Sequence, residues 1–320
     1  MLNTNGFRAK IQDPAVHGAV AMRVWQPWFM DPPSPSRIEN DIISAARPDE
    51  TRHGAANSGR RRRGPGGMQI TEYGTGPAVI FVHGLAFGGH DSWQAQLPLA
   101  ERWRLVVVSR LNYDESSSSD REDYVEDGRL LVELLDAEMP HGGAHLVAQS
   151  YGTLGAMLAA AQRPEAVRSL TLIESAASAV ARGTNLVDDC ERAMRELTWV
   201  PPEDADTFFR AMFATIEPRA TFPDPLPASL RAFAERSREP GAVRWPWDAE
   251  PDEFDLRLGS FPKLVVSGGR RPLFEAISDA LAERLGAERV VIPGGHGTQN
   301  VGGPFNDVLE TLMNQKGGRR

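Results

Sequence analysis

A serine at a strand-to-helix turn is the residue of this sequence with the clearest chemical potential. Ser150 stands in the run Ala148-Gln149-Ser150-Tyr151-Gly152, after an apolar strand-like segment and directly before an apolar helical pattern. Small residues two positions either side allow strand and helix to approach closely, and the sharp turn raises the serine Oγ above the sheet edge. The helix N-terminus offers N–H groups and a positive dipole end to a developing oxyanion. The pattern predicts a nucleophilic serine for acyl chemistry.

This turn resembles the nucleophile turn of the α/β-hydrolase superfamily, with Ala148 in place of the first glycine of the motif. The resemblance covers residues 68–176 and 262–315, about half of the chain. It implies an α/β fold in which a doubly wound, mostly parallel sheet carries a helical cap inserted after one strand.

A second motif of the resemblance concerns the oxyanion hole. Phe81-Val82-His83-Gly84-Leu85 is similar to the strand end that supplies the second oxyanion donor in that family. The resemblance therefore implies that the backbone N–H groups of Leu85 and Tyr151 form the hole. It also implies that His83 shapes the turn and takes no part in the reaction.

The general base is predicted to be His296. The family's chain order is serine, acid, histidine, and His296 is the one histidine of seven that follows Ser150. It stands in Pro293-Gly294-Gly295-His296-Gly297, after the last apolar strand-like segment, where glycines allow the imidazole to fold toward the nucleophile. A neutral histidine suits this role because its pKa lies near the operating pH.

The acid departs from the commonest family pattern. Most members carry an aspartate after the strand that corresponds to 263–267, but here the following loop holds Arg270 and Arg271. The family's alternative position is the end of the preceding strand, where Glu174 keeps the order serine, acid, histidine. Such an acid holds the histidine in the correct tautomer and stabilises the imidazolium. Glu174 is the predicted acid, with Glu275 or a site without an acid as the alternatives.

The side chains named above require a sheet to position them. From residue 68 onward, short Val, Ile and Leu runs, typical of parallel strands covered on both faces, alternate with helical stretches. This alternation indicates a doubly wound α/β sheet. The predicted strands are 69–73, Ala78–His83, Arg104–Ser109, Ala144–Gln149, Ser169–Glu174, Lys263–Ser267 and Arg289–Pro293, and the predicted core helices are about 91–101, 121–138, 151–163, 272–286 and 303–314.

The alternation also divides the chain into parts. The core comprises 68–175 and 262–320, and 176–261 is read as a helical cap with helices at about 185–198, 203–216 and 228–237. The cap is rich in aromatic side chains, which are expected mainly to pack but also suggest an apolar substrate of moderate size. These are Trp199, Phe208, Phe209, Phe213, Phe222, Phe233, Trp245 and Trp247.

The N-terminal segment, 1–67, is expected to be irregular because its composition buries too little apolar surface to offset ordering. Its run Arg60–Arg63 is read as a solvated basic linker, with contact to nucleic acid or an acidic surface as the alternative. An apolar patch over 19–30 could dock on the core or on a partner. Met68 is a possible natural start of the chain.

Composition excludes several classes of function. The formal net charge of −8 argues against a nucleic-acid partner. No run approaches the roughly 20 apolar residues of a membrane span, and no secretory signal is recognised. Cys190 is the only cysteine, which excludes an internal disulfide and a cysteine-built metal site. We therefore expect a cytoplasmic monomer or homodimer that acts on a small molecule without a metal or organic cofactor.

The leading functional hypothesis is a serine hydrolase that cleaves a small, largely apolar ester through an acyl-enzyme. Haloalkane dehalogenases and capped epoxide hydrolases of the superfamily use an aspartate nucleophile, so Ser150 argues against both. The alternatives are a C–C bond hydrolase or acyltransferase with the same triad, and a non-catalytic ligand-binding member of the fold. Arg270 and Arg271 are read either as a site for an acidic substrate group or as surface residues.

Overall fold

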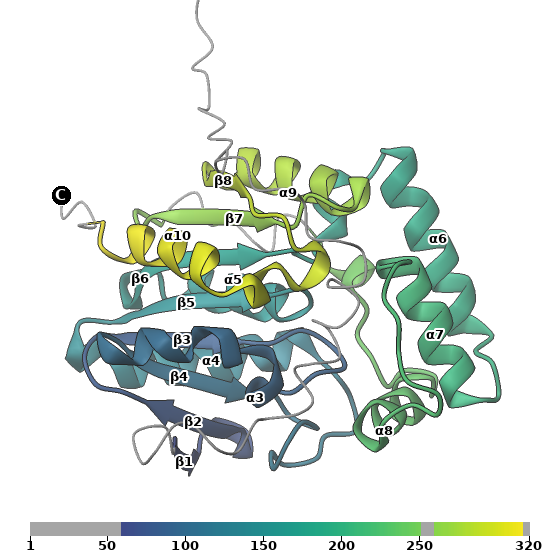
Figure 1. The fold of residues 1–320 in the computed structure, drawn as a ribbon, viewed down its shortest axis with the longest axis horizontal. Helices are drawn as coiled ribbons and strands as arrows, with labels where there is room; N and C mark the ends of the chain where they lie inside the picture. Colours follow the sequence, from purple (N-terminus) through teal and green to yellow (C-terminus); the bar gives the residue numbers. More distant parts are fainter. Residues whose placement is uncertain (1–58, 251–258, 316–320) are drawn as a thin grey trace, which may run out of the picture.

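Buried strands with helices on both faces dominate the computed structural model, which describes residues 59–250 and 259–315 (Figure 1). The apolar patch over 19–30 lies outside the described residues, as do the rest of 1–58, residues 251–258 of the predicted cap and residues 316–320.

The eight strands form one sheet in the order β1-β2-β4-β3-β5-β6-β7-β8. β1–β2 and β2–β4 pair antiparallel and every other neighbouring pair is parallel. The inner strands β3 and β5 are buried along their whole length. The unbroken apolar run of β3 predicts this burial, whereas β5 also buries His145 and Gln149. The strands are β1 Arg60–Arg63, β2 Gln69–Tyr73, β3 Ala78–Val82, β4 Arg104–Ser109, β5 Ala144–Gln149, β6 Val167–Ile173, β7 Lys263–Ser267 and β8 Glu288–Val291.

Helices cover both faces of this sheet. α4, α5 and α9 contribute to the hydrophobic cluster on one face, whereas α10 and the 3₁₀ segment η2 pack on the other. The predicted helix at 91–101 is instead a short α3 followed by η2, with a break at Trp93, whose φ and ψ of −126° and 19° are not helical. Pro98, inside η2, lacks the N–H that an α-helical turn needs. The bounds are α3 Gly89–Ser92, η2 Gln94–Glu101, α4 Tyr124–Glu138, α5 Gly152–Gln162, α9 Pro272–Leu285 and α10 Gly303–Met313. None of the helices in the described residues is long and apolar enough to cross a lipid bilayer.

The run Arg60–Arg63 is mostly exposed, as predicted, but the prediction that it is a linker is wrong. This run forms β1, an edge strand whose register sets Arg60 opposite Glu72 of β2. Successive side chains of a strand alternate between its faces, so Arg60 and Arg62 both reach Glu72, at 2.7 and 2.9 Å. Glu72 is only 8% exposed, and these cations offset the cost of burying its charge. The ordered core therefore begins before residue 68.

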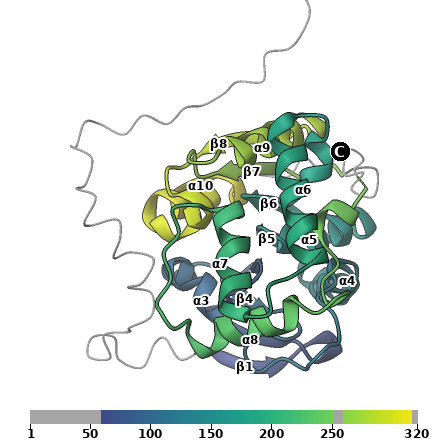
Figure 2. The same cartoon turned by 90° about the vertical axis from the view of Figure 1, so that its right-hand side faces the viewer.

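A helical insertion, which we define as residues 176–250, follows β6. Its helices are α6 Asn185–Trp199, α7 Ala205–Ile216 and α8 Ala228–Ser237, and they stand together beyond one end of the sheet (Figures 1 and 2). Phe208, Phe209 and Phe233 are fully buried in a cluster that also includes Ala86 and Tyr113 of the core. These aromatic side chains, which were expected mainly to pack, therefore pack the insertion against the loops after β3 and β4.

Candidate active site

Ser150 lies in a tight turn between β5 and α5. Its φ of 51° is in the left-handed region, which costs a non-glycine residue energy and tends to occur at functional sites. The turn is held because the Ser150 N–H donates to the carbonyl of Ile173 at 2.9 Å. A Cβ at Gly152 would lie 2.4 Å from the carbonyl oxygen of His83. The small residue predicted at this position is therefore needed where the helix meets the end of β3.

Three side chains far apart in the chain meet at this turn. Ser150 Oγ lies 3.0 Å from His296 Nε2, and His296 Nδ1 lies 3.3 Å from Glu174 Oε2. A carboxylate only accepts hydrogen bonds, so this contact places the imidazole proton on Nδ1 and leaves Nε2 to accept the serine proton. The arrangement has the geometry that a nucleophile, its base and an orienting acid require.

Glu174, at the end of β6, is held by hydrogen bonds of both its backbone N–H and its carboxylate. It is 2% exposed and has a positive φ of 46°. Its N–H donates to the carbonyl of Val266 at 2.8 Å, and its Oε1 accepts a hydrogen bond from the N–H of Gly268. The neighbouring strand β7 thus fixes both the backbone and the carboxylate that faces His296.

The alternative acid, Glu275, has different partners. Its carboxylate accepts from Ser267 Oγ at 2.8 Å, from the N–H of Gly269 at 3.1 Å and from Arg289 Nη2 at 2.6 Å. Glu275 therefore fastens the start of α9 to β7 and β8. The carboxylate partner of His296 in this structure is Glu174.

His296 lies in the 3₁₀ segment η8, Gly295–Val301. Its carbonyl accepts a hydrogen bond from Gln149 Nε2 at 3.0 Å, and its ring packs on Phe274 with 4.5 Å between centroids. Sequence reasoning did not identify Gln149 or Phe274. Gln149 could have been singled out because it directly precedes Ser150 in the sequence. Nothing in the sequence pattern of α9 distinguishes Phe274 from a core residue.

The turn after β3 lies against the serine. A Cβ at Gly84 would come within 2.8 Å of Ser150 Cβ, and Ala86 has a φ of 72°. Leu85 and Tyr151, the predicted oxyanion donors, both line the same pocket as Ser150. The structure therefore brings the two predicted donor residues to the cavity that Ser150 also lines.

His83 is fully buried beneath this turn. Its Nδ1–H donates to the carbonyl of Gly84 at 2.8 Å, and its Nε2 accepts the N–H of Arg110 at 3.0 Å. Burial, assisted by the positive charge of Arg110, holds the pKa of His83 well below its usual value. A neutral imidazole with both nitrogens engaged is consistent with the expected structural role.

A cavity of about 90 Å³ opens at Ser150, between the sheet and the helical insertion. Its walls are mainly apolar side chains from α6, α7, α9 and the 3₁₀ segment η6, Pro246–Asp248. Trp245 and Trp247 line it as a stacked pair. Ser178 donates a hydrogen bond to Glu191, and this pair forms a polar part of the wall.

Of the two arginines read as a site for an acidic group, Arg270 lies beside the loop of His296, where a Cβ at Gly295 would come within 2.9 Å of its Nη1. Arg271 donates to the carbonyl of Thr215 at 2.8 Å, which joins the start of α9 to α7. Neither Arg270 nor Arg271 is among the residues that line the cavity at Ser150. Within residues 59–250 and 259–315, no group of three or more His, Cys, Asp and Glu side chains is placed to hold a metal ion.

Known proteins share this architecture. Three similar solved structures are a membrane phospholipase A described as a bacterial virulence factor, an N-acyl homoserine lactone degrading enzyme, and a loop variant of a haloalkane dehalogenase from Bradyrhizobium elkanii. Their sequence identities are 21%, 22% and 23% and their TM-scores are 0.60, 0.54 and 0.57. The alignments cover 88%, 77% and 80% of this chain and 93%, 97% and 96% of the respective structures. At these identities the likeness establishes the fold alone.

The family comparison is more direct. No curated protein matches the sequence. A family model described as alpha/beta hydrolase fold matches residues 77–301, which include the turn after β3, the serine turn and the loop of His296. Because this match spans well over half of the sequence, the chain belongs to the alpha/beta hydrolase fold family.

Proposed function

We propose that this protein is a serine hydrolase that cleaves small, largely apolar esters through an acyl-enzyme. The observation that carries the proposal is the continuous set of contacts from Glu174 through His296 to Ser150, at 3.3 and 3.0 Å. A serine hydroxyl is a weak nucleophile unless a neighbouring base takes its proton. Membership of a hydrolase family supports the same class of reaction.

In the proposed reaction, Ser150 Oγ attacks the ester carbonyl while His296 Nε2 takes the hydroxyl proton. The oxyanion accepts hydrogen bonds from the N–H groups of Leu85 and Tyr151. The C–O bond to the alcohol then breaks as His296 returns the proton to the leaving oxygen, which leaves an acyl-enzyme. Water, deprotonated by His296, attacks the acyl carbon and releases the acid and Ser150. Glu174 stabilises the imidazolium in both halves of the reaction.

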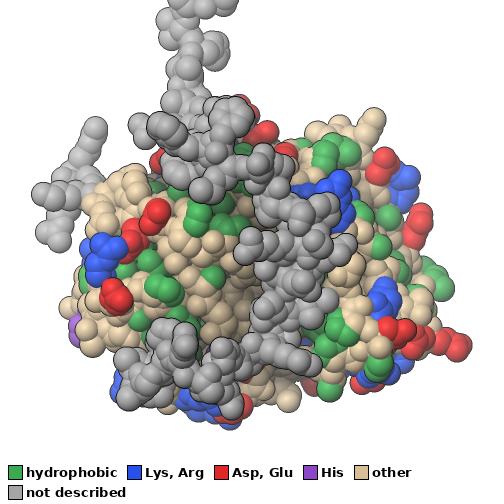
Figure 3. All heavy atoms as spheres, viewed as in Figure 1, with side chains coloured by type: hydrophobic (Ala, Val, Ile, Leu, Met, Phe, Trp, Pro, Cys, Tyr) green, Lys and Arg blue, Asp and Glu red, His purple; other side chains and the backbone are tan. Residues whose placement is uncertain are grey.

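The cavity supports the proposed substrate class. A volume of about 90 Å³ with apolar walls suits a short acyl or alcohol group better than a long chain or a polymer. The net charge of −8 disfavours nucleic acid as a partner. On the face drawn in Figure 3, the described basic and acidic side chains are interspersed and do not gather into one basic area.

A panel of p-nitrophenyl esters from acetate to decanoate tests the proposal. Wild type should show saturable turnover with the shorter esters and a burst of one p-nitrophenol per chain. Ser150→Ala should lower kcat by about 10³-fold or more. Turnover by wild type no faster than by Ser150→Ala would contradict the proposal.

The same experiment separates the alternatives that use this site. Stoichiometric acylation without turnover would favour a ligand-binding member of the fold. Acceleration by an added alcohol, with the transferred ester as product, would favour an acyltransferase. Hydrolysis of a β-diketone but of no ester in the panel would favour a C–C hydrolase.

A further inference from the structure

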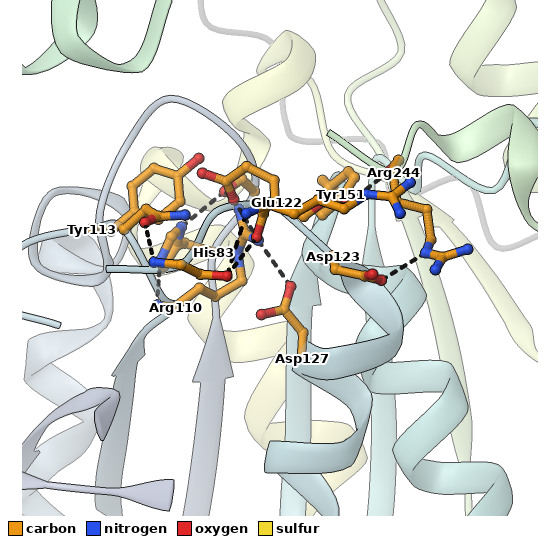
Figure 4. A network of polar contacts seen from close by, with 12 residues as sticks. His83, Arg110, Tyr113, Glu122, Asp123, Asp127, Tyr151 and Arg244 are labelled. Carbon is orange, nitrogen blue, oxygen red and sulfur yellow. Dashed lines mark hydrogen bonds and ion pairs between the residues drawn. The ribbon is translucent and has the colours of Figure 1, made fainter. Parts of the chain in front are cut away.

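Arg110, immediately after β4, is a buried cation next to the proposed oxyanion hole. Its side chain is 1% exposed. Nη1 contacts Asp127 Oδ2 at 2.8 Å and Glu122 Oε2 at 3.2 Å. A buried charge is costly unless it is paired and hydrogen-bonded, so these contacts fix the guanidinium in one position. Figure 4 shows it at the centre of a polar network.

The network holds the turn after β3 at three points. Arg110 Nη2 donates to the carbonyl of Gly84 at 2.9 Å, and the Arg110 N–H donates to His83 at 3.0 Å. Tyr113, next to the guanidinium, accepts the N–H of Ala86 on its hydroxyl at 3.2 Å. Gly84 and Ala86, the residues on both sides of Leu85, are therefore attached to the Arg110 network.

The same guanidinium also contacts the other proposed donor residue. It lies over the rings of Tyr113 and Tyr151, at 4.9 and 5.0 Å from their centroids. The Tyr151 hydroxyl in turn donates to the carbonyl of Arg244 at 2.8 Å. Arg110 thus contacts both the turn that carries Leu85 and the side chain of Tyr151, the two residues whose N–H groups would bind the oxyanion.

The carboxylate partner Glu122 extends the network to the helical insertion. Its N–H donates to the carbonyl of Ala242 at 2.7 Å, and its carbonyl accepts the N–H of Arg244 at 2.8 Å. Its Oε1 lies 3.4 Å from Nη2 of Arg236, on α8. The Glu122 carboxylate therefore contacts both the Arg110 guanidinium and Arg236 of the helical insertion.

We propose that Arg110 is a positioning residue that sets the spacing of the Leu85 and Tyr151 amides, and that Glu122 and Arg236 transmit the position of α8 to this pair. The proposal rests on the proposed serine hydrolase reaction. It predicts a loss in kcat when the network is weakened, because the oxyanion forms only after the substrate has bound. A purely structural ion pair would alter stability and leave kcat unchanged.

Two substitutions weaken the network without removing the buried arginine. Tyr113→Phe keeps the aromatic ring and removes the acceptor for the Ala86 N–H. Arg236→Met removes the contact of α8 with Glu122, and Arg236→Lys restores a cation there. Arg231→Met is the matched control, since Arg231 lies on the same helix and pairs with Asp206 outside the network.

The readouts are kcat and KM for an ester substrate and the Ki of a trifluoromethyl ketone, whose adduct with Ser150 carries an oxyanion. Deleting an oxyanion donor costs about 10²- to 10³-fold in kcat, so displacing one by Tyr113→Phe should cost roughly tenfold. Arg236→Met should cost roughly threefold, as expected for the contact of a partly exposed cation with a buried carboxylate at 3.4 Å. In both variants KM should stay within about twofold while Ki rises in parallel with the loss in kcat. Arg236→Lys and Arg231→Met should resemble wild type.

Unchanged kcat and Ki in Tyr113→Phe and Arg236→Met, with a lower free energy of unfolding, would overturn the inference and leave the proposed function intact. A loss in Arg231→Met equal to that in Arg236→Met would also overturn it. Wild type that neither hydrolyses an ester nor binds the ketone would instead refute the proposed function, and the inference with it. If Tyr113→Phe does not fold, the Arg236 series alone decides between these outcomes.

Discussion

Two glutamates near the carboxyl ends of β6 and β7 differ in what their carboxylates contact. Glu174 faces His296, whereas Glu275 contacts Arg289, which is 6% exposed. Glu174→Gln should lower kcat by about 10³- to 10⁴-fold, because an amide cannot stabilise the imidazolium and favours the wrong tautomer. Glu275→Gln should leave kcat within about threefold and lower the free energy of unfolding by about 1–3 kcal/mol. Steady-state kinetics and urea unfolding of both variants measure this contrast, and a larger kinetic loss in Glu275→Gln would contradict it.

A buried histidine outside the site makes stability depend on pH. Burial, with a smaller effect of the Arg168 charge, lowers the pKa of His145 from 6.5 to about 3. Between these values the unfolded chain binds a proton at this residue and the folded chain does not. The contribution of His145 to the free energy of unfolding is therefore fully present above pH 6.5. It decreases by about 1.4 kcal/mol per pH unit as the pH falls toward 3.

His145→Asn should flatten the dependence of unfolding free energy on pH between about 3 and 6.5. The exposed His141 provides the control, and His141→Asn should leave the wild-type slope in place. Urea unfolding at several pH values measures the slope. Equal slopes in His145→Asn and wild type would show that His145 is not the group responsible.

Among single residues, local spacing and the chain order that the family resemblance implies select Ser150 and His296, and the structure places Ser150 Oγ 3.0 Å from His296 Nε2. Glu174 was weighed against Glu275, and only the fold reveals which of them His296 contacts. Arg110 was not identified, because its partners come from separate segments that the fold brings together. A charged residue immediately after a buried strand was the one available signal.

At the element scale, the contact of α5 with the end of β3 depends on a glycine. In Gly152→Ala the new Cβ would meet the backbone carbonyl of His83, which cannot rotate away. We expect a loss of about 1–3 kcal/mol in the free energy of unfolding and a lower kcat, because β3 carries the proposed oxyanion turn. At Gly303, the first residue of α10, a Cβ would meet nothing within 4 Å.

Gly303→Ala is thus the matched control, and it should leave kcat unchanged and stability equal or higher by less than about 1 kcal/mol. Urea unfolding and ester kinetics on the two variants measure the difference. Equal kcat and equal free energy of unfolding in Gly152→Ala and Gly303→Ala would show that the contact of α5 with the end of β3 tolerates a side chain at position 152.

The elements that sequence reasoning predicted well are those with a clear apolar period. β4, β5 and β7 begin and end where their Val, Ile and Leu runs indicate. β1 was missed because four successive arginines have no apolar alternation, and the strand depends on a carboxylate of its neighbour. Such pairing is a property of the folded sheet and is not visible in the run itself.

At the scale of the whole molecule, β1 also bears on where the chain can start. A chain that begins at Met68 lacks β1, so Glu72 keeps only its contact with Arg104 at 3.4 Å. Lost backbone hydrogen bonds of about 1 kcal/mol each and weaker ion pairs should lower the free energy of unfolding by roughly 2–4 kcal/mol. The comparison is with a chain that begins at Gly59, measured by urea unfolding. Equal stability would mean that β1 contributes nothing and that Met68 is an adequate start.

The whole fold is shared with proteins described as a phospholipase, a lactone-degrading enzyme and a haloalkane dehalogenase. The reaction of this chain therefore depends on its site and not on its architecture. In the proposed reaction, His296 activates Ser150. Peptide mapping by mass spectrometry after treatment with a fluorophosphonate tests it most directly, because the probe reports activation without knowledge of the substrate. We expect one adduct per chain, on Ser150, that is absent from Ser150→Ala and forms much more slowly in Glu174→Gln. A folded wild-type protein that forms no adduct, or forms it at another residue, would show that His296 does not activate Ser150.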